Sequence, residues 1–330
     1  MDFALTDDQE LLVETARRLL RAECPTSLVR AVRDEPDAAA PLWRHLRGYA
    51  ALGAGDATDL CLFLEETGSV AAPGPFLATA LAGRLLSAAG ATERDAVLAG
   101  EITATVALAG PDGAWTPNDR PVKTFVLEAD RVDLVVVVDA GGRVALVPPT
   151  DVAVRRVETA DWTRRTCEVD TTGVPRDRSI DPGAVDAWRD AAHVAAGAEL
   201  VGTARRIFDM ALAYAKERRQ FGVPIGSFQA IQHKLAEMAL LLERATAAVH
   251  YAAMTVDAAA PDRARAGHVA KAAAGEAARR CVRDGIQIHG GIGYTWEHDL
   301  HLFLRRATAD TCLLGTAAWH HDRIADLLLS

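Results

Sequence analysis

The residues best suited to hold a phosphate-bearing ligand lie in a segment that follows a long helical pattern. This segment spans 217–225, reads ERRQFGVPI, and is followed by Gln229. Arg218 stands where the helical pattern meets a Gly-Pro turn, which predicts a permanently charged, fork-shaped donor at an exposed corner, suited to a diphosphate. Phe221 could offer an adenine or a ribose an apolar face. A surface ion pair with a nearby acid is the alternative interpretation of Arg218.

A second segment combines an amide side chain with closely spaced glycines. It spans 287–294 and reads QIHGGIGY. Gln287 lies near the end of another helical pattern, and the Gly290-Gly291 pair would let a ligand approach the backbone without Cβ atoms in the way. Glycines that follow a helix are usually caps, so this pattern becomes informative only together with the first segment.

The elements that must position these residues begin with helices. Thr6 followed by Gln9 predicts a capping box, and apolar residues then recur at helical spacing. Further helices are expected over 59–67 and 75–89, because proline and glycine breakers separate two periodic runs. We therefore predict an N-terminal helical domain over residues 1–100.

Short β-branched runs replace the helical pattern in the middle of the chain. Strands are expected over 103–108, 124–127, 134–138 and 143–147, with turns at 110–113 and 141–142. These runs predict a reduced β-domain over residues 101–182, with short connections in place of long functional loops.

Long helical patterns return in the last part of the chain. They cover roughly 185–219, 227–260, 263–289 and 300–329. These lengths predict a C-terminal four-helix bundle over residues 183–330. The fold class is therefore α+β, but the order of elements alone names no chemistry.

Composition excludes several classes of partner and site. The formal net charge of −9 opposes general attraction to nucleic acid or to anionic membranes. The five cysteines are scattered without a C-x-x-C pair, so neither a disulfide framework nor a metal site is expected. The N-terminus lacks a basic leader and no run approaches the ~20 apolar residues of a membrane span, so we expect a cytoplasmic protein.

The two segments, together with Glu65-Glu66-Thr67-Gly68 and the order of the domains, closely resemble the acyl-CoA dehydrogenase family. The resemblance spans the chain and is strongest over 202–313. It implies an acyl-CoA dehydrogenase-like fold, an acyl-CoA substrate and FAD as cofactor. It further implies that the matching residues hold the ADP half of an FAD whose flavin ring lies in the neighbouring subunit; they are Arg218, Gln220, Phe221, Gln229, Gln287, Gly290 and Gly291.

The carboxylate that removes the α-proton in the family has no counterpart here. Where relatives carry Glu-Gly-Thr, the chain reads Leu314-Gly315-Thr316, and the resemblance to a flavin contact at Thr316 is weakened by that leucine. Relatives with the base on the earlier helix place it at the position of Ala192, just before His193. No catalytic residue is therefore assigned. The remaining titratable candidates, for which salt bridges or core hydrogen bonds are the commoner explanation, are Glu199, Asp310, His193, His320 and His321.

The β-domain departs from the family in the same sense. Relatives carry Thr-Glu-Pro and Trp-x-Thr segments against the flavin ring, whereas residues 106–113 read VALAGPDG and no comparable second segment follows. Trp115 and Trp162 lie outside the expected contexts, so we interpret them as core aromatics of a small sheet.

Residues that serve a neighbour's FAD are thus retained, while those that serve the chain's own flavin ring and proton abstraction are missing. The pattern resembles the shorter subunit of the heteromeric, α2β2 acyl-CoA dehydrogenases of steroid-degrading actinobacteria. It implies a paralogous partner and α,β-desaturation of an acyl-CoA, with a steroid side-chain thioester as one candidate. Two alternatives stay open: a redox-neutral lyase or hydratase homodimer with His193 or His320 as base, and a non-catalytic scaffold subunit.

Overall fold

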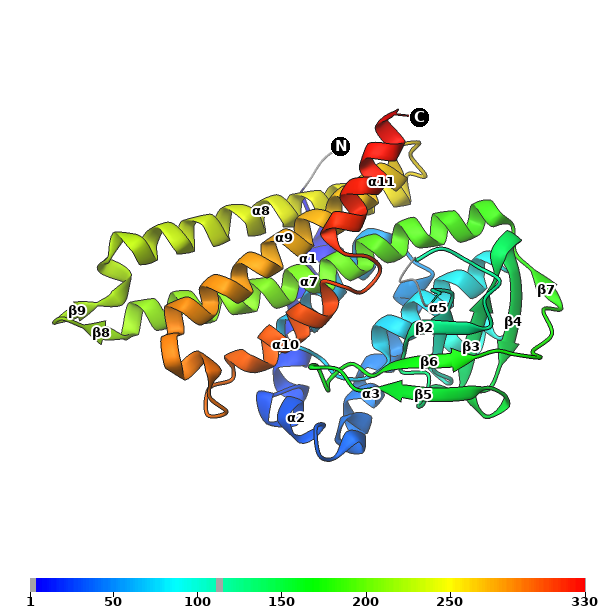
Figure 1. Cartoon of the computed structure of the whole chain (residues 1–330), viewed down its shortest axis with the longest axis horizontal. Helices are drawn as coiled ribbons and strands as arrows, with labels where there is room; N and C mark the ends of the chain where they lie inside the picture. The colour runs from blue at the N-terminus through cyan, green and yellow to red at the C-terminus, as the bar shows by residue number, and fades with distance from the viewer. Residues whose placement is uncertain (1–3, 111–114, 330) are drawn as a thin grey trace. The chain divides into compact units, whose positions relative to one another are not determined.

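The computed structural model describes residues 4–110 and 115–329 (Figure 1). Most of the turn expected at 110–113 lies outside the described residues. The chain forms two compact units, each built from separated stretches. The first combines Met1–Arg30, Cys61–Ala72 and His193–Ser330, and the second combines Ala31–Leu60 and Pro73–Ala192. The division into three domains at residues 100 and 182 stays a prediction.

The expected capping box begins the first helix. Helix α1 spans Asp7–Glu23, the Thr6 side chain accepts a hydrogen bond from the Gln9 backbone N–H, and the Gln9 side chain accepts one from the Thr6 N–H. Two backbone donors at the helix start are thereby satisfied, as the sequence predicts.

The expected helices of the first hundred residues are confirmed. Helices α4 (Ala57–Ser69) and α5 (Phe76–Ala88) occupy the two predicted runs. Helix α5 is buried around most of its circumference, and the Trp188 indole donates to the Leu81 carbonyl 2.7 Å away. The remaining elements are short: α2 (Thr26–Ala31), η1 (Pro36–Ala39), α3 (Ala40–Leu46), η2 (Arg47–Gly53) and α6 (Arg94–Leu98).

Two small sheets follow. One has the order β1-β3-β4-β7, with β1 and β3 parallel, and the other has the antiparallel order β2-β6-β5. Their apolar faces share a core that includes Val135, Val137, Cys167 and Val169. The strands are β1 (Ala104–Ala107), β2 (Val122–Leu127), β3 (Leu134–Val138), β4 (Arg143–Val147), β5 (Ala153–Val157), β6 (Thr166–Asp170) and β7 (Arg178–Ser179).

All four predicted strands are present, but three further strands of these sheets were missed. Strand β5 reads AVRRV and exposes most of its side chains, and its Arg155 pairs with Glu168 of β6. Strand β7 has two residues. Strands β5 and β7 are too polar or too short to show the apolar alternation by which a strand is recognised in a sequence, whereas β6 does alternate and was overlooked.

Long helices dominate the C-terminal part, where α7, α8 and α9 run side by side in Figure 1. Lys234 of α8 and Asp284 of α9 form an ion pair of 3.2 Å, so the start of one helix packs beside the end of the other. The helices are α7 (Pro182–Glu217), α8 (Gln229–Asp257), α9 (Arg263–His289), α10 (Leu300–Asp310) and α11 (Ala317–Leu329). Between them lie β8 (Arg219–Gln220), β9 (Val223–Pro224), η5 (Ile225–Ser227) and η6 (Gly290–Tyr294).

The expectation of one continuous helix over 300–329 is wrong. Helix α10 ends at Asp310 and α11 begins at Ala317. Leu314 and Gly315 take φ values of 55° and 101°, which no right-handed helix can include. A side chain at position 315 would also collide, because a Cβ there would lie 2.6 Å from the Trp319 ring. The turn therefore requires its glycine.

Two glycines bring α4 and α7 into backbone contact. A Cβ on Gly202 would lie 1.9 Å from the Glu65 carbonyl oxygen, and one on Gly68 would lie 2.0 Å from that of Glu199. Beside this crossing, the buried Glu199 carboxylate lies 3.5 Å from Arg306 and accepts from the Thr67 hydroxyl. A substitution here meets backbone that cannot move aside.

No helix in the described part of the chain combines the length and the apolar character needed to cross a membrane.

We expect Gly202→Ala to lower the free energy of unfolding by about 1–3 kcal/mol, because its methyl group would force two packed helices apart. Chemical denaturation followed by circular dichroism measures the effect. Gly48→Ala is the matched control, since nothing lies within 4 Å of a Cβ at that exposed position, and should stay within about 0.5 kcal/mol of wild type. Equal stability of the two variants would contradict the close crossing.

Candidate functional site

Arg218 lies at the junction between α7 and the β8–β9 hairpin. Its N–H donates to the Tyr214 carbonyl and its carbonyl accepts from the Ile225 N–H, both at 2.8 Å, so the backbone closes the hairpin. Among the described residues, no hydrogen bond or ion pair engages its exposed guanidinium. The alternative of a surface ion pair is therefore not what this structure shows, and the side chain remains available to an external anion.

The hairpin tip displays an aromatic ring in an unfavourable backbone conformation. Phe221 has a φ of 52°, followed by Gly222 at 82°, and the Phe221 side chain is 92% exposed. Arg219 donates to the Gly222 carbonyl and Gln220 donates to that of Arg219, which holds the tip together. A strained, exposed aromatic residue is more typical of a contact site than of a solvated loop.

The second predicted segment ends α9. Gln287 is exposed in the last turn, and Gly290 ends the helix with a φ of 64° while its N–H donates to the Ile286 carbonyl. Gly290 is thus a helix cap, as glycines that follow a helix usually are. Both Gly290 and Gly291 are exposed, with open space where a Cβ would stand, so a ligand could reach this backbone.

The structure gathers the two segments at one end of the long helices (Figure 1). Tyr214, one turn before Arg218, stacks on His289 with ring centroids 4.5 Å apart. A Cβ on Gly285 would lie 2.8 Å from the Ile207 side chain, so the last turns of α7 and α9 are in close contact. Gln229 begins α8 at the same end and is exposed. The ends of α7 and α9, near which the two predicted segments lie, are therefore in contact, and the cofactor role of the seven residues stays a prediction.

The two segments and the residues that follow them also carry large apolar side chains in contact with solvent. Besides Phe221, exposed rings occur at Phe228 before α8, at Tyr294 in η6 and at Trp296 after η6, with exposures of 39%, 74% and 49%. The rings of Phe221 and Phe228 meet edge to face at 6.2 Å. Exposed aromatic groups beside an uncommitted arginine suit a ligand or a protein partner better than bulk water.

Neither expected carboxylate position offers a proton acceptor. Leu314 is buried, at 4% exposure, and Ala192 is fully buried within α7. Thr316 is exposed and accepts a hydrogen bond from the Trp319 N–H, so it caps α11. The chain lacks a carboxylate of its own at both places.

Imidazoles instead surround the Leu314 turn. His193, His268 and His320 are buried, and one ligand atom from each lies within 4.8 Å of the others. His320 shares a 2.7 Å hydrogen bond with His268 and another of 2.9 Å with the Leu314 carbonyl. Burial lowers the pKa of His320 to about 2, and the charge of Lys271 acts in the same direction. A general base at neutral pH needs a higher pKa than this.

The other titratable candidates have structural partners. Glu199 is held by Arg306 and Thr67 in the first unit. Exposed His321 pairs with Glu276 at 3.4 Å. Asp310 is buried, and its backbone carbonyl accepts from the Lys271 ammonium. Of these, none faces a described cavity.

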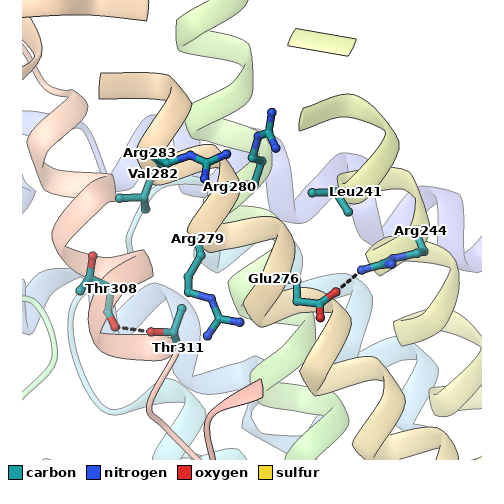
Figure 2. Close-up of a pocket in the computed structure, with 9 residues that line it drawn as sticks. All are labelled: Leu241, Arg244, Glu276, Arg279, Arg280, Val282, Arg283, Thr308 and Thr311. Carbon is teal, nitrogen blue, oxygen red and sulfur yellow. Dashed lines mark hydrogen bonds and ion pairs between the residues drawn. The ribbon is translucent and has the colours of Figure 1, made fainter. Parts of the chain in front are cut away.

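A groove of about 700 Å³ lies against α8, α9 and α10 (Figure 2). Arg244 pairs with Glu276, while Arg280 and Arg283 pair with Asp284. The groove is lined by Leu241, Arg244, Glu276, Arg279, Arg280, Val282, Arg283, Thr308 and Thr311.

Arg279 makes the groove a candidate anion site. It is exposed, and no hydrogen bond or ion pair within residues 4–110 and 115–329 engages it. Figure 2 shows its guanidinium directed toward the side formed by Thr308 and Thr311. A negatively charged group could pair with it there.

In the β-region, Trp115 is a core aromatic as predicted, with 6% exposure and its ring 5.4 Å from that of Phe125. Trp162 is half-buried under the Arg33 guanidinium. Sequence reasoning missed His268, Lys271 and Arg279. No local pattern marks them, because their roles arise only when α9 packs against α10 and α11.

Comparison with known proteins supports one family. Residues 190–329 match the model of the acyl-CoA dehydrogenase C-terminal domain. Acyl-CoA dehydrogenase IpdE2 of Mycolicibacterium smegmatis is 32% identical over 323 residues, covering 94% of this chain and 96% of the relative. Acyl-CoA dehydrogenase FadE34 of Mycobacterium tuberculosis is 33% identical over 94% of this chain and 46% of its own length.

Solved structures share the fold. The Tcur3481-Tcur3483 steroid ACAD G363A variant has a TM-score of 0.88 at 26% identity and 98% coverage of both chains. The ChsE4-ChsE5 complex from Mycobacterium tuberculosis has a TM-score of 0.86 at 22% identity, covering 100% of this chain and 99% of that one. With a full-length relative above 30% identity and this fold, the chain belongs to the acyl-CoA dehydrogenase family, whose cofactor is FAD.

Proposed function

We propose that this chain is the shorter subunit of a heteromeric, FAD-dependent acyl-CoA dehydrogenase, whose partner supplies the catalytic carboxylate and the flavin-ring contacts. One contrast carries the proposal. Leu314 and Ala192 are buried aliphatic residues where a base would stand, while the Arg218 guanidinium remains uncommitted at an exposed end. We infer that a chain without a catalytic base but with residues suited to FAD contributes those residues to the active site of another subunit.

The residues at the hairpin end fit the ADP half of FAD. The Arg218 fork can pair with a diphosphate, and Phe221 can cover an adenine or ribose face. Gln220, Gln229 and Gln287 offer amide groups on the same exposed surface. Gly290 and Gly291 leave room for a ligand against the backbone. Bound FAD supplies the hydride acceptor for α,β-desaturation, and these side chains would orient it without taking part in proton transfer.

The exposed aromatics at this end favour a protein partner over a free cofactor site. Phe221 and Tyr294 leave most of their surface in contact with water in the single chain. Burial of such rings is a common source of interface stability. Two of the similar solved structures are named as pairs of proteins, Tcur3481-Tcur3483 and ChsE4-ChsE5. We therefore propose a paralogous partner in an α2β2 assembly.

For the substrate, we propose the CoA thioester of a steroid side chain. The support is that one of the similar solved structures, Tcur3481-Tcur3483, is a steroid ACAD. In the desaturation the partner's carboxylate would take the α-proton, and the β-hydrogen would leave as hydride.

A histidine-based lyase receives no support from the geometry. His193 and His320 lie in a closed, buried cluster, and the low pKa of His320 leaves it a weak base. The non-catalytic scaffold differs from our proposal in one measurable property, the dependence of FAD binding on Arg218.

We expect Arg218→Ala to weaken FAD binding by the complex of this chain with its paralogous partner by roughly 10- to 100-fold. The loss of a charge-assisted contact to phosphate, worth about 1.5–3 kcal/mol, sets this range. Fluorescence titration of the deflavinated complex with FAD measures it.

Arg18→Ala is the matched control, because Arg18 is also exposed but lies on α1; it should bind FAD as wild type does. A scaffold subunit would leave the Arg218→Ala complex with unchanged affinity, and that result would end the proposal.

We also expect two FAD molecules in each assembled tetramer, because only one of the two subunit types would hold a flavin ring. The isolated chain should retain little FAD through size-exclusion chromatography. Flavin absorbance against protein concentration gives the count. Four FAD per tetramer, or dehydrogenase turnover by this chain alone, would contradict the division of labour.

A further inference from the structure

The three buried histidines come from three different helices. His193 lies on α7, His268 on α9 and His320 on α11. Their ring centroids lie 4.9 to 5.0 Å apart, and one ligand nitrogen from each falls within 4.8 Å of the other two. Neutral imidazole nitrogen is the commonest protein ligand of metal ions.

The orientation of His320 suits a metal ligand. Its Nε2 lies 2.9 Å from the Leu314 carbonyl oxygen, which can only accept, so Nε2 carries the proton. The lone pair is therefore on Nδ1, which faces Nδ1 of His268 at 2.7 Å. A histidine that binds a metal through one nitrogen usually donates a hydrogen bond from the other, often to a backbone carbonyl.

Trp319 packs against the three imidazoles, and a buried lysine and aspartate lie nearby. The Trp319 ring meets all three imidazoles edge-on, with centroids 4.9 to 6.0 Å away. The nearby Lys271 ammonium donates to the carbonyls of Asp310 and Gly315, and the Asp310 carboxylate opposes its charge.

We infer that His193, His268 and His320 form a binding site for a divalent metal ion of borderline softness, such as Zn²⁺ or Co²⁺. Three imidazoles supply three of the four positions of a tetrahedral ion and leave one for water. Binding replaces the His268–His320 hydrogen bond: the proton on His268 Nδ1 is exchanged for one on Nε2 of the same ring, so that the imidazole stays neutral and its Nδ1 lone pair faces the ion. The ion would join α7, α9 and α11 at the turn that lacks the carboxylate.

Cobalt is the probe of choice, because its visible absorption reports ligand geometry. Metal-free full-length chain is titrated with Co²⁺, and we expect one ion per chain with the intense visible bands of a tetrahedral site. At a hundredfold excess of free Co²⁺ over its Kd, the melting temperature should rise by about 4 °C. Zn²⁺ should displace Co²⁺, and a chelator should reverse both effects.

His320→Gln and His321→Gln form the matched pair, since the two residues are adjacent on α11 but His321 points toward Glu276. Loss of His320 should weaken Co²⁺ binding by more than about 100-fold, whereas loss of His321 should leave it unchanged. Where His320→Gln misfolds, His268→Gln and the chelator reversal on wild-type chain decide the question.

Absence of Co²⁺ bands at millimolar concentration in wild-type chain, or equal loss in the His321→Gln variant, would overturn the inference. Neither result bears on the proposed FAD contacts near the β8–β9 hairpin, which the Arg218→Ala variant tests separately.

Discussion

The buried ammonium of Lys271 is the interaction on which the end of the helical bundle depends. Its Nζ donates to the carbonyl of Asp310, the last residue of α10, and to that of Gly315, just before α11. The last turn of a helix leaves carbonyl groups without intrahelical donors, and the ammonium satisfies one of these at Asp310 as well as the Gly315 carbonyl in the following turn. Burial lowers the pKa of Lys271 to about 8, so most of the ammonium stays charged at neutral pH. The ammonium thus ties together the two sides of the break between α10 and α11, where Leu314 and Gly315 take positive φ values.

The turn at Leu314 differs from the same turn in relatives that carry a catalytic carboxylate there. The resemblance implies that many relatives carry their catalytic carboxylate at the position of Leu314. Here the same turn presents a buried leucine, a histidine-bound carbonyl and a glycine against which the Trp319 ring packs. At the hairpin, by contrast, the exposed Arg218 guanidinium makes no hydrogen bond or ion pair with the described residues. The Leu314 turn is buried, whereas the tip of the hairpin is exposed.

Much of this arrangement is readable from residue order, and the exceptions have physical causes. Strands β3 and β4 were predicted to the residue because every side chain of β3 is apolar. Strand β5 escaped because Arg155 and Arg156 face solvent. The break at Leu314 was missed because a left-handed leucine leaves no compositional mark, and one glycine alone rarely divides a helix. The location of the cofactor residues at one end was expected from the motifs, whereas His268 joined its two partners only through packing.

The tip of the β8–β9 hairpin is unfavourable in a chain that stands alone. A phenylalanine in the left-handed conformation with 92% of its surface wet is unfavourable both in backbone energy and in hydration. In the single chain, the Phe221 ring is therefore available for non-specific contact with other apolar surfaces. Covering the ring, whether by another protein or by a bound ligand, would remove its contact with water.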